Sequence, residues 1–257
     1  MSRFFSRASG GKYQLDVHEI RAGFVAAETA YDRVRRLRAE RVSRVVALET
    51  PTPVGDGSKL ILHGLPVGVL QDAWARFLAM RQKQIANLLQ PIGGLPESWG
   101  FNLDGFVLHN VPSFGDDLRR QCYTQLFRDG GLEVVSGRVL LAREEKAFYA
   151  WGMEQIVIGH FARYQEFWQL VGVTPPVLVG LALTGVKGWR VLHHPSSLST
   201  GRGVFDRDVV ILPEVAISDF NLPADVVLRP LFDVIWSGGG WPGSPNYREG
   251  RWVAPPT

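Results

Sequence analysis

The chain has 257 residues, of which 46% are hydrophobic and 21% are charged, a composition typical of globular proteins and far from that of disordered chains. Its formal net charge of +3 identifies no partner, so any nucleic-acid argument depends on where the basic residues cluster. The lone cysteine, Cys122, cannot form an internal disulfide, and no run of about 18 apolar residues exists. We therefore expect a cytoplasmic protein that does not enter a membrane.

The first fifty residues predict a strand followed by a long helix. Residues 3–7 alternate in character and precede Ser9-Gly10-Gly11, a pattern typical of a strand that ends in a loop. We expect the partner of this strand to be remote, to come from another copy, or to be missing because the chain is the tail of a longer protein. Asp16 followed by Glu19 predicts the helix start, and apolar residues then recur at helical spacing to about Leu48.

The segment from Pro51 to Gly57 ends this helix and predicts an internal boundary. Residues 1–50 then form a strand remnant with its helix, and residues 51–257 form an α+β domain. The order of strands and helices, with a hairpin at Asp129-Gly130-Gly131, favours a mixed, partly antiparallel sheet packed against several helices. Strands are predicted at 59–65, 177–184 and 209–217, a short meander at 101–110 and 123–139, and helices at 72–89, 144–171 and 225–236.

Five segments carry a resemblance to a known family: RFFSRASGGKYQLDVHEIRAGF, RLRAERVSRVVALETPTPV, FNLDGFVLH, YTQLFRDGGLEVV and LRPLFDVIWSGGGWPGSPNYREGRW. They are similar to the C-terminal region of bacterial Schlafen/AlbA-like proteins, which are described as ATP- or DNA-binding proteins. The resemblance implies that the first segment closes the Schlafen/AlbA-like domain and that the rest is an accessory domain. The core that handles nucleic acid in that family would lie upstream of Met1, so its activity is not carried over to this chain.

The densest charge cluster lies on the first predicted helix, where six of the twelve residues from 33 to 44 are arginines and Glu40 is the only acid. Arg33, Arg36 and Arg44 share one helical face and could follow the phosphates of DNA or RNA. The alternative is a solvated face whose arginines pair with nearby acids. The candidate nucleic-acid contacts are Arg33, Arg36, Arg38, Arg41 and Arg44.

The other polar clusters complete no catalytic or metal motif. The histidines are isolated except for His193-His194, and no CxxC, HExxH or HxH pattern exists, so we expect no metal site. Glu144-Glu145-Lys146 is interpreted as the acidic start of a helix rather than as part of a nuclease site. No glycine run has a P-loop ending, and the serines at 196–199 lack a nucleophile elbow. We expect no cofactor and no catalytic residues, which favours a protein that is not an enzyme.

Two functional hypotheses follow. The first is a non-catalytic accessory domain that contacts nucleic acid or a protein partner, including a second copy or an upstream Schlafen-like domain. The alternative is a sensor or enzyme that takes a nucleotide-like ligand in a cleft near the polar loop of residues 193–208. The ligand-binding candidates there are His193, His194, Arg202 and Arg207.

Overall fold

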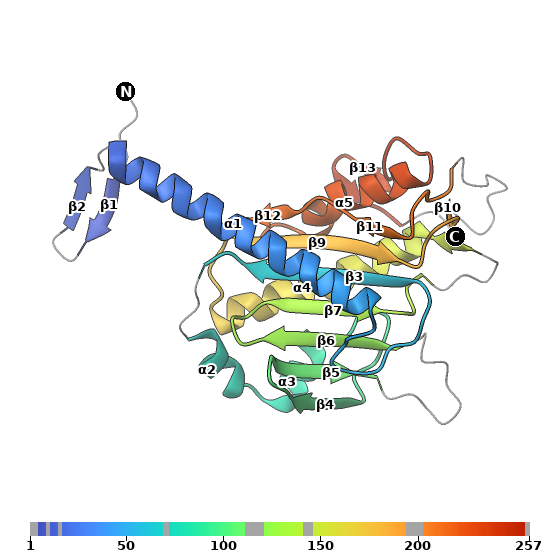
Figure 1. Ribbon diagram of the computed structural model, residues 1–257, viewed down its shortest axis with the longest axis horizontal. Helices are drawn as coiled ribbons and strands as arrows, with labels where there is room; N and C mark the ends of the chain where they lie inside the picture. The colour runs from blue at the N-terminus through green and yellow to red at the C-terminus, as the bar shows by residue number, and fades with distance from the viewer. Residues whose placement is uncertain are drawn as a thin grey trace.

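The computed structural model describes residues 5–8, 11–14, 17–68, 72–110, 121–140, 146–193 and 203–254, with side chains from residue 28 onward. The predicted α+β class is confirmed, because an eight-stranded antiparallel sheet lies between helices (Figure 1). Across the sheet the strands run β11 (Val209–Ile211), β9 (Val177–Thr184), β3 (Lys59–Pro66), β7 (Leu132–Ser136), β6 (Cys122–Phe127), β5 (Gly105–His109) and β4 (Ser98–Phe101), and β12 (Val215–Ile217) also pairs with β9.

One face of this sheet is crossed by the long helix α1 (Val17–Val46) (Figure 1). Apolar side chains on the inner side of α1, among them Val42 and Val45, pack on Ile61 and Val135 from the central strands. A neighbouring cluster joins Val34 of the same helix to the sheet. Because the strands are covered on both faces, β3 and β9 are buried at every position, which explains their largely apolar sequences.

The opposite face carries the main hydrophobic core. It packs against α4 (Ala150–Val171) and α5 (Ala224–Gly238), with α2 (Ala73–Leu78) and α3 (Gln82–Leu88) beside α4. Trp168 of α4 lies close against the backbone of Gly64 in β3, where any side chain would collide with the indole ring. Trp168 also donates a hydrogen bond from its ring nitrogen to the carbonyl oxygen of Gly130, at 3.0 Å.

The N-terminal strand has a local partner. β1 (Phe5–Ala8) pairs in antiparallel fashion with β2 (Gly11–Gln14), and this hairpin lies at the start of α1, away from the sheet (Figure 1). The expectation of a remote, intermolecular or missing partner is therefore wrong. A strand ending in a glycine-containing turn can close on the next residues of its own chain, and the sequence pattern did not exclude this.

The C-terminal segment is attached to the core by buried polar contacts. Its strands β13 (Tyr247–Arg248) and β14 (Arg251–Trp252) form a small hairpin. The fully buried carboxylate of Glu154 in α4 accepts hydrogen bonds from Trp252 Nε1 at 2.8 Å and Asn246 Nδ2 at 2.7 Å. Because a buried carboxylate needs such donors, these contacts fix the tail against α4 and α5.

Three predicted elements differ from those observed. Residues 72–89 form two helices, α2 and α3, because Arg81 adopts an extended conformation between them. Residues 209–217 divide into β11 and β12, whereas the meander predicted over 101–110 and 123–139 is observed as the antiparallel run from β4 to β7. The helix predicted from residue 144 begins only at Ala150: residues 147–149 form strand β8 (Ala147–Tyr149), which pairs in parallel with β10 (Arg190–Leu192).

The chain segment around residue 50 connects α1 to β3, where the sequence predicts a domain boundary. The part of α1 from Val34 onward shares its hydrophobic clusters with strands of the region beyond residue 50. This half of α1 is thus packed on the sheet, and the division into two domains stays a prediction. Within the described ranges, no helix has both the length and the apolar character needed to cross a membrane.

Candidate functional site

The arginines of α1 divide between an inner and an outer side of the helix. Arg38 and Arg41 are buried, whereas Arg33, Arg36 and Arg44 are exposed. At 100° per residue, Arg38 falls within the arc that holds the buried valines of α1 and Arg41 lies next to it, whereas the other three lie well outside it. The five predicted nucleic-acid contacts therefore do not share one surface.

Arg38 joins α1 to the edge of the sheet. Its Nη2 donates to the carbonyl oxygen of Leu181 at 2.7 Å, and its Nη1 donates to the carbonyl oxygen of Leu212 at 2.9 Å and to Glu214 Oε1 at 3.0 Å. The guanidinium lies directly over Gly180 of β9, where a β-carbon would overlap with it. Because Gly180 has no side chain, the charged guanidinium of Arg38 can lie flat on the sheet.

Arg41 is held by a buried carboxylate at the centre of the same face. Its Nε and Nη2 donate to the two oxygens of Glu133 in β7, at 2.9 and 2.6 Å, a bidentate arrangement. Glu133 also accepts from Tyr123 Oη at 2.8 Å and lies 3.0 Å from His63 Nε2. All four side chains are buried, and Glu133 and His63 have no exposed surface.

The surroundings of Glu133 favour its ionised form. Burial alone would raise the pKa of the carboxyl group, but hydrogen bonds from Arg41 and His63, together with their charge, lower it from 4.5 to about 2. Burial, followed by the charge of Glu133, raises the pKa of Tyr123 well above its ordinary value, so the phenol remains a hydrogen-bond donor. The network therefore holds α1 against the sheet. Because Arg41 Nε and Nη2 both donate to Glu133, this side chain cannot bind a phosphate bidentately.

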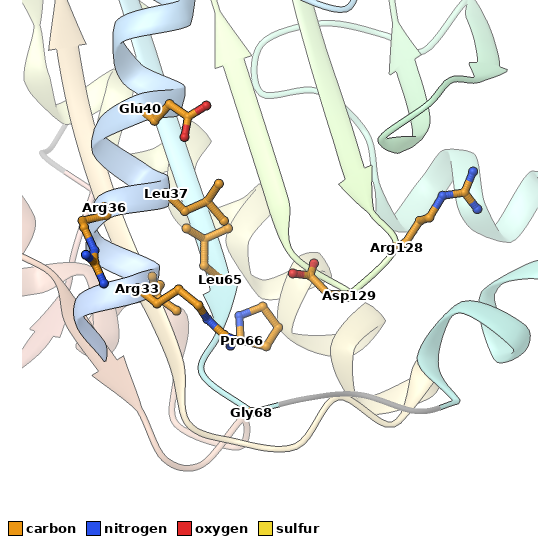
Figure 2. A pocket seen from close by; sticks show the side chains of 10 residues that line it. Arg33, Arg36, Leu37, Glu40, Leu65, Pro66, Gly68, Arg128 and Asp129 are labelled. Atoms are coloured by element: carbon orange, nitrogen blue, oxygen red, sulfur yellow. The ribbon is translucent and has the colours of Figure 1, made fainter. Parts of the chain in front are cut away.

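The outer side of α1 borders a hollow of about 730 Å³ between this helix, the end of β3 and the turn from β6 to β7 (Figure 2). Apolar side chains such as Val34 and Leu65 line part of it. Charged side chains stand around them, with Arg33 and Arg36 on the α1 side and Arg128 and Asp129 on the turn (Figure 2). The hollow is open, and five of the ten residues that line it carry a charge, which favours a charged ligand over an apolar one.

Arg33 and Arg36 differ from the other exposed arginines in the part of α1 whose side chains are described. Arg35 pairs with Asp32 at 3.3 Å, and Arg44 pairs with Glu40 at 2.7 Å. Among the residues that the structure describes, Arg33 and Arg36 form no ion pair and no side-chain hydrogen bond. Figure 2 shows the side chain of Arg33 extending from α1 toward Pro66, across one side of the hollow.

The four ligand-binding candidates near the 193–208 loop are only partly covered by the structure. The ring of His193 packs against Trp236 and Trp241, with centroids 5.7 and 5.9 Å apart. Arg207 pairs with the adjacent Asp206 on the surface, with Nε 2.8 Å from Oδ1. His194 and Arg202 lie outside the described residues, as do Glu144 and Glu145. The nucleotide-like ligand of this loop stays a prediction.

Sequence reasoning missed the Glu133 network, although it left a signal. Glu133 is the only charged residue of β7, and His63 is the only ionisable residue in the interior of β3. The two are direct partners in the antiparallel register. A single ionisable residue in the middle of each of two apolar strands indicates a buried pair, because unpaired charges are very rarely buried.

The comparisons with known proteins add no assignment: no protein-family model matches the chain, and no curated protein or solved structure is significantly similar to it. In the part of the chain that is described, no three histidine, cysteine, aspartate or glutamate side chains converge as a metal site requires. The candidate site is therefore the hollow beside α1, defined by its own geometry and charge.

Proposed function

We propose that this chain is a non-catalytic accessory domain that binds the phosphate backbone of nucleic acid with the outer side of α1. The observation that carries the proposal is the pair Arg33 and Arg36, which are exposed, unpaired and adjacent on the wall of an open hollow. Two free guanidinium groups one helical turn apart can each bind a phosphate bidentately. The resemblance to the C-terminal region of Schlafen/AlbA-like proteins supports the same reading, since an accessory domain can assist a neighbouring domain that handles nucleic acid.

Arg44 extends this surface along the helix. Its ion pair with Glu40 is exposed on both sides, and such pairs contribute only about 0.2–1 kcal/mol. A phosphate can therefore compete with Glu40 for the Arg44 guanidinium at little cost. Arg33, Arg36 and Arg44 together define what we call the outer arginine face, and it leaves the anchoring residues Arg38 and Arg41 in place.

The proposal is tested by the salt dependence of binding to a labelled duplex, measured by fluorescence anisotropy. Each phosphate contact on duplex DNA contributes about 0.9 to the slope of log K against log salt concentration. Changing Arg33, Arg36 and Arg44 together to glutamine is expected to weaken binding at low salt and to reduce that slope by roughly 2–3. Glutamine is a good helix former, so α1 is expected to remain folded.

The matched control removes the same charge elsewhere. Arg207, Arg229 and Arg248 are exposed arginines of the C-terminal third, and their joint replacement by glutamine lowers the net charge equally. Under the proposal this control keeps nearly the full affinity and slope. Equal losses in both triple variants would mean that binding follows net charge alone, and an unchanged slope in the α1 variant would remove the outer arginine face as the contact surface.

A further inference from the structure

The hollow beside α1 has an apolar floor that a phosphate contact leaves unused. Val34 and Leu37 come to this floor from α1, and Leu65 and Pro66 come from the end of β3. Phosphates bind to cations and hydrogen-bond donors, which these four side chains lack. With about 730 Å³, the hollow has the volume of a site for a small organic molecule. It therefore has room for a further part of a ligand whose phosphates lie on α1.

The charged side chains of the hollow are those of three arginines and two acids. Arg33 and Arg36 are exposed and form no ion pair among the described residues, so they are free to bind phosphates. Arg128 is held elsewhere, because its guanidinium lies 5.0 Å from the centre of the Trp74 ring and its Nε donates to the carbonyl oxygen of Leu103 at 3.4 Å. The phosphate contacts consequently come from α1, and the two acids remain for another part of the ligand.

Of the two acids, Asp129 is the one that a ligand can use. Glu40 already accepts from Arg44 at 2.7 Å. Asp129 is exposed, and its Oδ1 accepts from the backbone N–H of Gly131 at 3.0 Å, whereas its Oδ2 has no partner among the described residues. Figure 2 shows this carboxylate turned toward α1, with Arg33 on the other side of the hollow. Because a carboxylate only accepts hydrogen bonds and repels phosphate, it favours a ligand part that carries N–H donors.

A nucleotide supplies all these groups: a phosphate for the arginines, flat apolar faces for the floor, and N–H donors on the edge of its base. Among the four DNA bases, guanine alone has two adjacent N–H donors, N1 and the 2-amino group, which match the two oxygens of a carboxylate. In a duplex the base is stacked and its N1–H is paired, so only an unpaired base can enter the hollow. Building on the proposed function, we propose that the hollow takes one unpaired base of a single strand, with guanine preferred, while Arg33 and Arg36 bind the adjoining phosphates.

The probe is a short labelled strand of thymidines with one central guanosine, titrated with the full chain and followed by anisotropy. Its matched counterpart has inosine at the centre, which differs from guanosine only by the missing 2-amino group. An all-thymidine strand measures the backbone contact alone. We expect the guanosine strand to bind roughly 5- to 30-fold more tightly than the inosine strand. The guanosine strand annealed to its complement should also bind less tightly than the single strand, because it keeps only the backbone contacts.

Two variants assign the preference to one side chain. Asp129→Asn keeps a side-chain oxygen for the N–H of Gly131 but removes one of the two acceptors that face guanine. It is expected to abolish the preference for guanosine over inosine. Glu40→Gln removes the same charge from the same hollow, so both variants should strengthen the binding of every strand to a similar, small extent. Only Glu40→Gln should keep the guanosine preference in full.

The outcomes separate this inference from the proposed function. Equal affinity for the guanosine and inosine strands, with a salt slope that still depends on the outer arginine face, would overturn the base site and leave the backbone contact in place. A guanosine preference that survives in Asp129→Asn would overturn the assignment of the base to this hollow. Equal affinity for the single strand and its duplex would overturn the need for an unpaired base. Absence of binding by every strand, the all-thymidine one included, would overturn the proposed function and this inference with it.

Discussion

Replacing Glu133 by glutamine is expected to destabilise the protein strongly, although the two side chains have nearly the same size. The carboxylate has no exposed surface and accepts from Arg41, Tyr123 and His63. A glutamine presents only one acceptor oxygen, and its amide group would face donors. Arg41 would then be a buried cation left only with the half-exposed Asp104, whose Oδ2 lies 3.8 Å from Nη1, and removing the buried partner of such a pair costs about 3–5 kcal/mol in other proteins.

The pH dependence of stability gives an independent measure of the same residue. The pKa of Glu133 is about 2 in the folded protein, below its ordinary value of 4.5. Its ionised form therefore stabilises the fold fully above about pH 4.5, and this stabilisation is lost as the pH falls through the interval from 4.5 toward 2. The difference between the two pKa values corresponds to about 3 kcal/mol, which is consistent with the expected effect of the substitution.

Urea unfolding at a series of pH values tests both statements. Above about pH 5, Glu133→Gln should lower the free energy of unfolding by about 3 kcal/mol or more. Below pH 4.5 the gap to the unmodified chain should narrow, because that chain loses its own ion pair. Glu40→Gln, which alters an exposed acid on α1, is the control and should stay within about 0.5 kcal/mol. A Glu133→Gln protein as stable as the control at neutral pH would refute the reasoning.

Two further predictions concern the main core. The Cys122 thiol has no exposed surface, and burial raises its pKa. A thiol reagent should therefore label the folded protein far more slowly than the urea-unfolded protein, and equal labelling rates would contradict this. Gly64→Ala places a methyl group against the ring of Trp168 and should lower the stability by about 1–3 kcal/mol and Tm by roughly 2–12 °C, as measured by calorimetry; an unchanged Tm would mean that Trp168 can move away.

Local patterns in the sequence were sufficient for most of the fold. A strand with one exposed face alternates apolar and polar residues, whereas β3 and β9 have runs of consecutive apolar residues. Both strands are buried at every position. The turn after Phe127 was recognisable from its Asp-Gly-Gly sequence, and β6 and β7 do pair across it. These elements are determined by side-chain burial and turn chemistry within a few residues, which is information that one sequence contains.

The elements that were missed depend on contacts between distant residues. No glycine or proline separates α2 from α3, so the apolar spacing from 72 to 89 is continuous, yet the chain turns at Arg81. Residues 147–149 continue the apolar pattern of α4, but they pair with β10, more than forty residues further along the chain. Helical periodicity shows only which face of a segment is apolar. It contains no information about a distant strand, such as β10, with which the segment can pair.

The candidate site was predictable in outline and not in detail. The arginine cluster of α1 was evident, and the helical arc that contains Val34 and Val45 already indicates which of its members face the sheet. The acceptors of the buried members lie far away in sequence: Glu133 for Arg41, and the backbone of Leu181 for Arg38. Without the strand order, a buried arginine with such acceptors cannot be told from a surface arginine that faces solvent.

This division of the arginines also determines how a loss of nucleic-acid binding should be interpreted. Arg41→Gln would leave Glu133 without its main partner and would loosen α1 from the sheet, so binding would fall through a change in structure. Arg33→Gln and Arg36→Gln remove groups that support nothing inside the described fold, so binding would fall while the unfolding midpoint stays constant. The proposed contact surface therefore requires that Arg33→Gln and Arg36→Gln lower the affinity for nucleic acid without lowering the stability. It also requires that Arg41→Gln lower both. If the outer variants were also unstable, the unpaired state of Arg33 and Arg36, on which the proposed function depends, would be wrong.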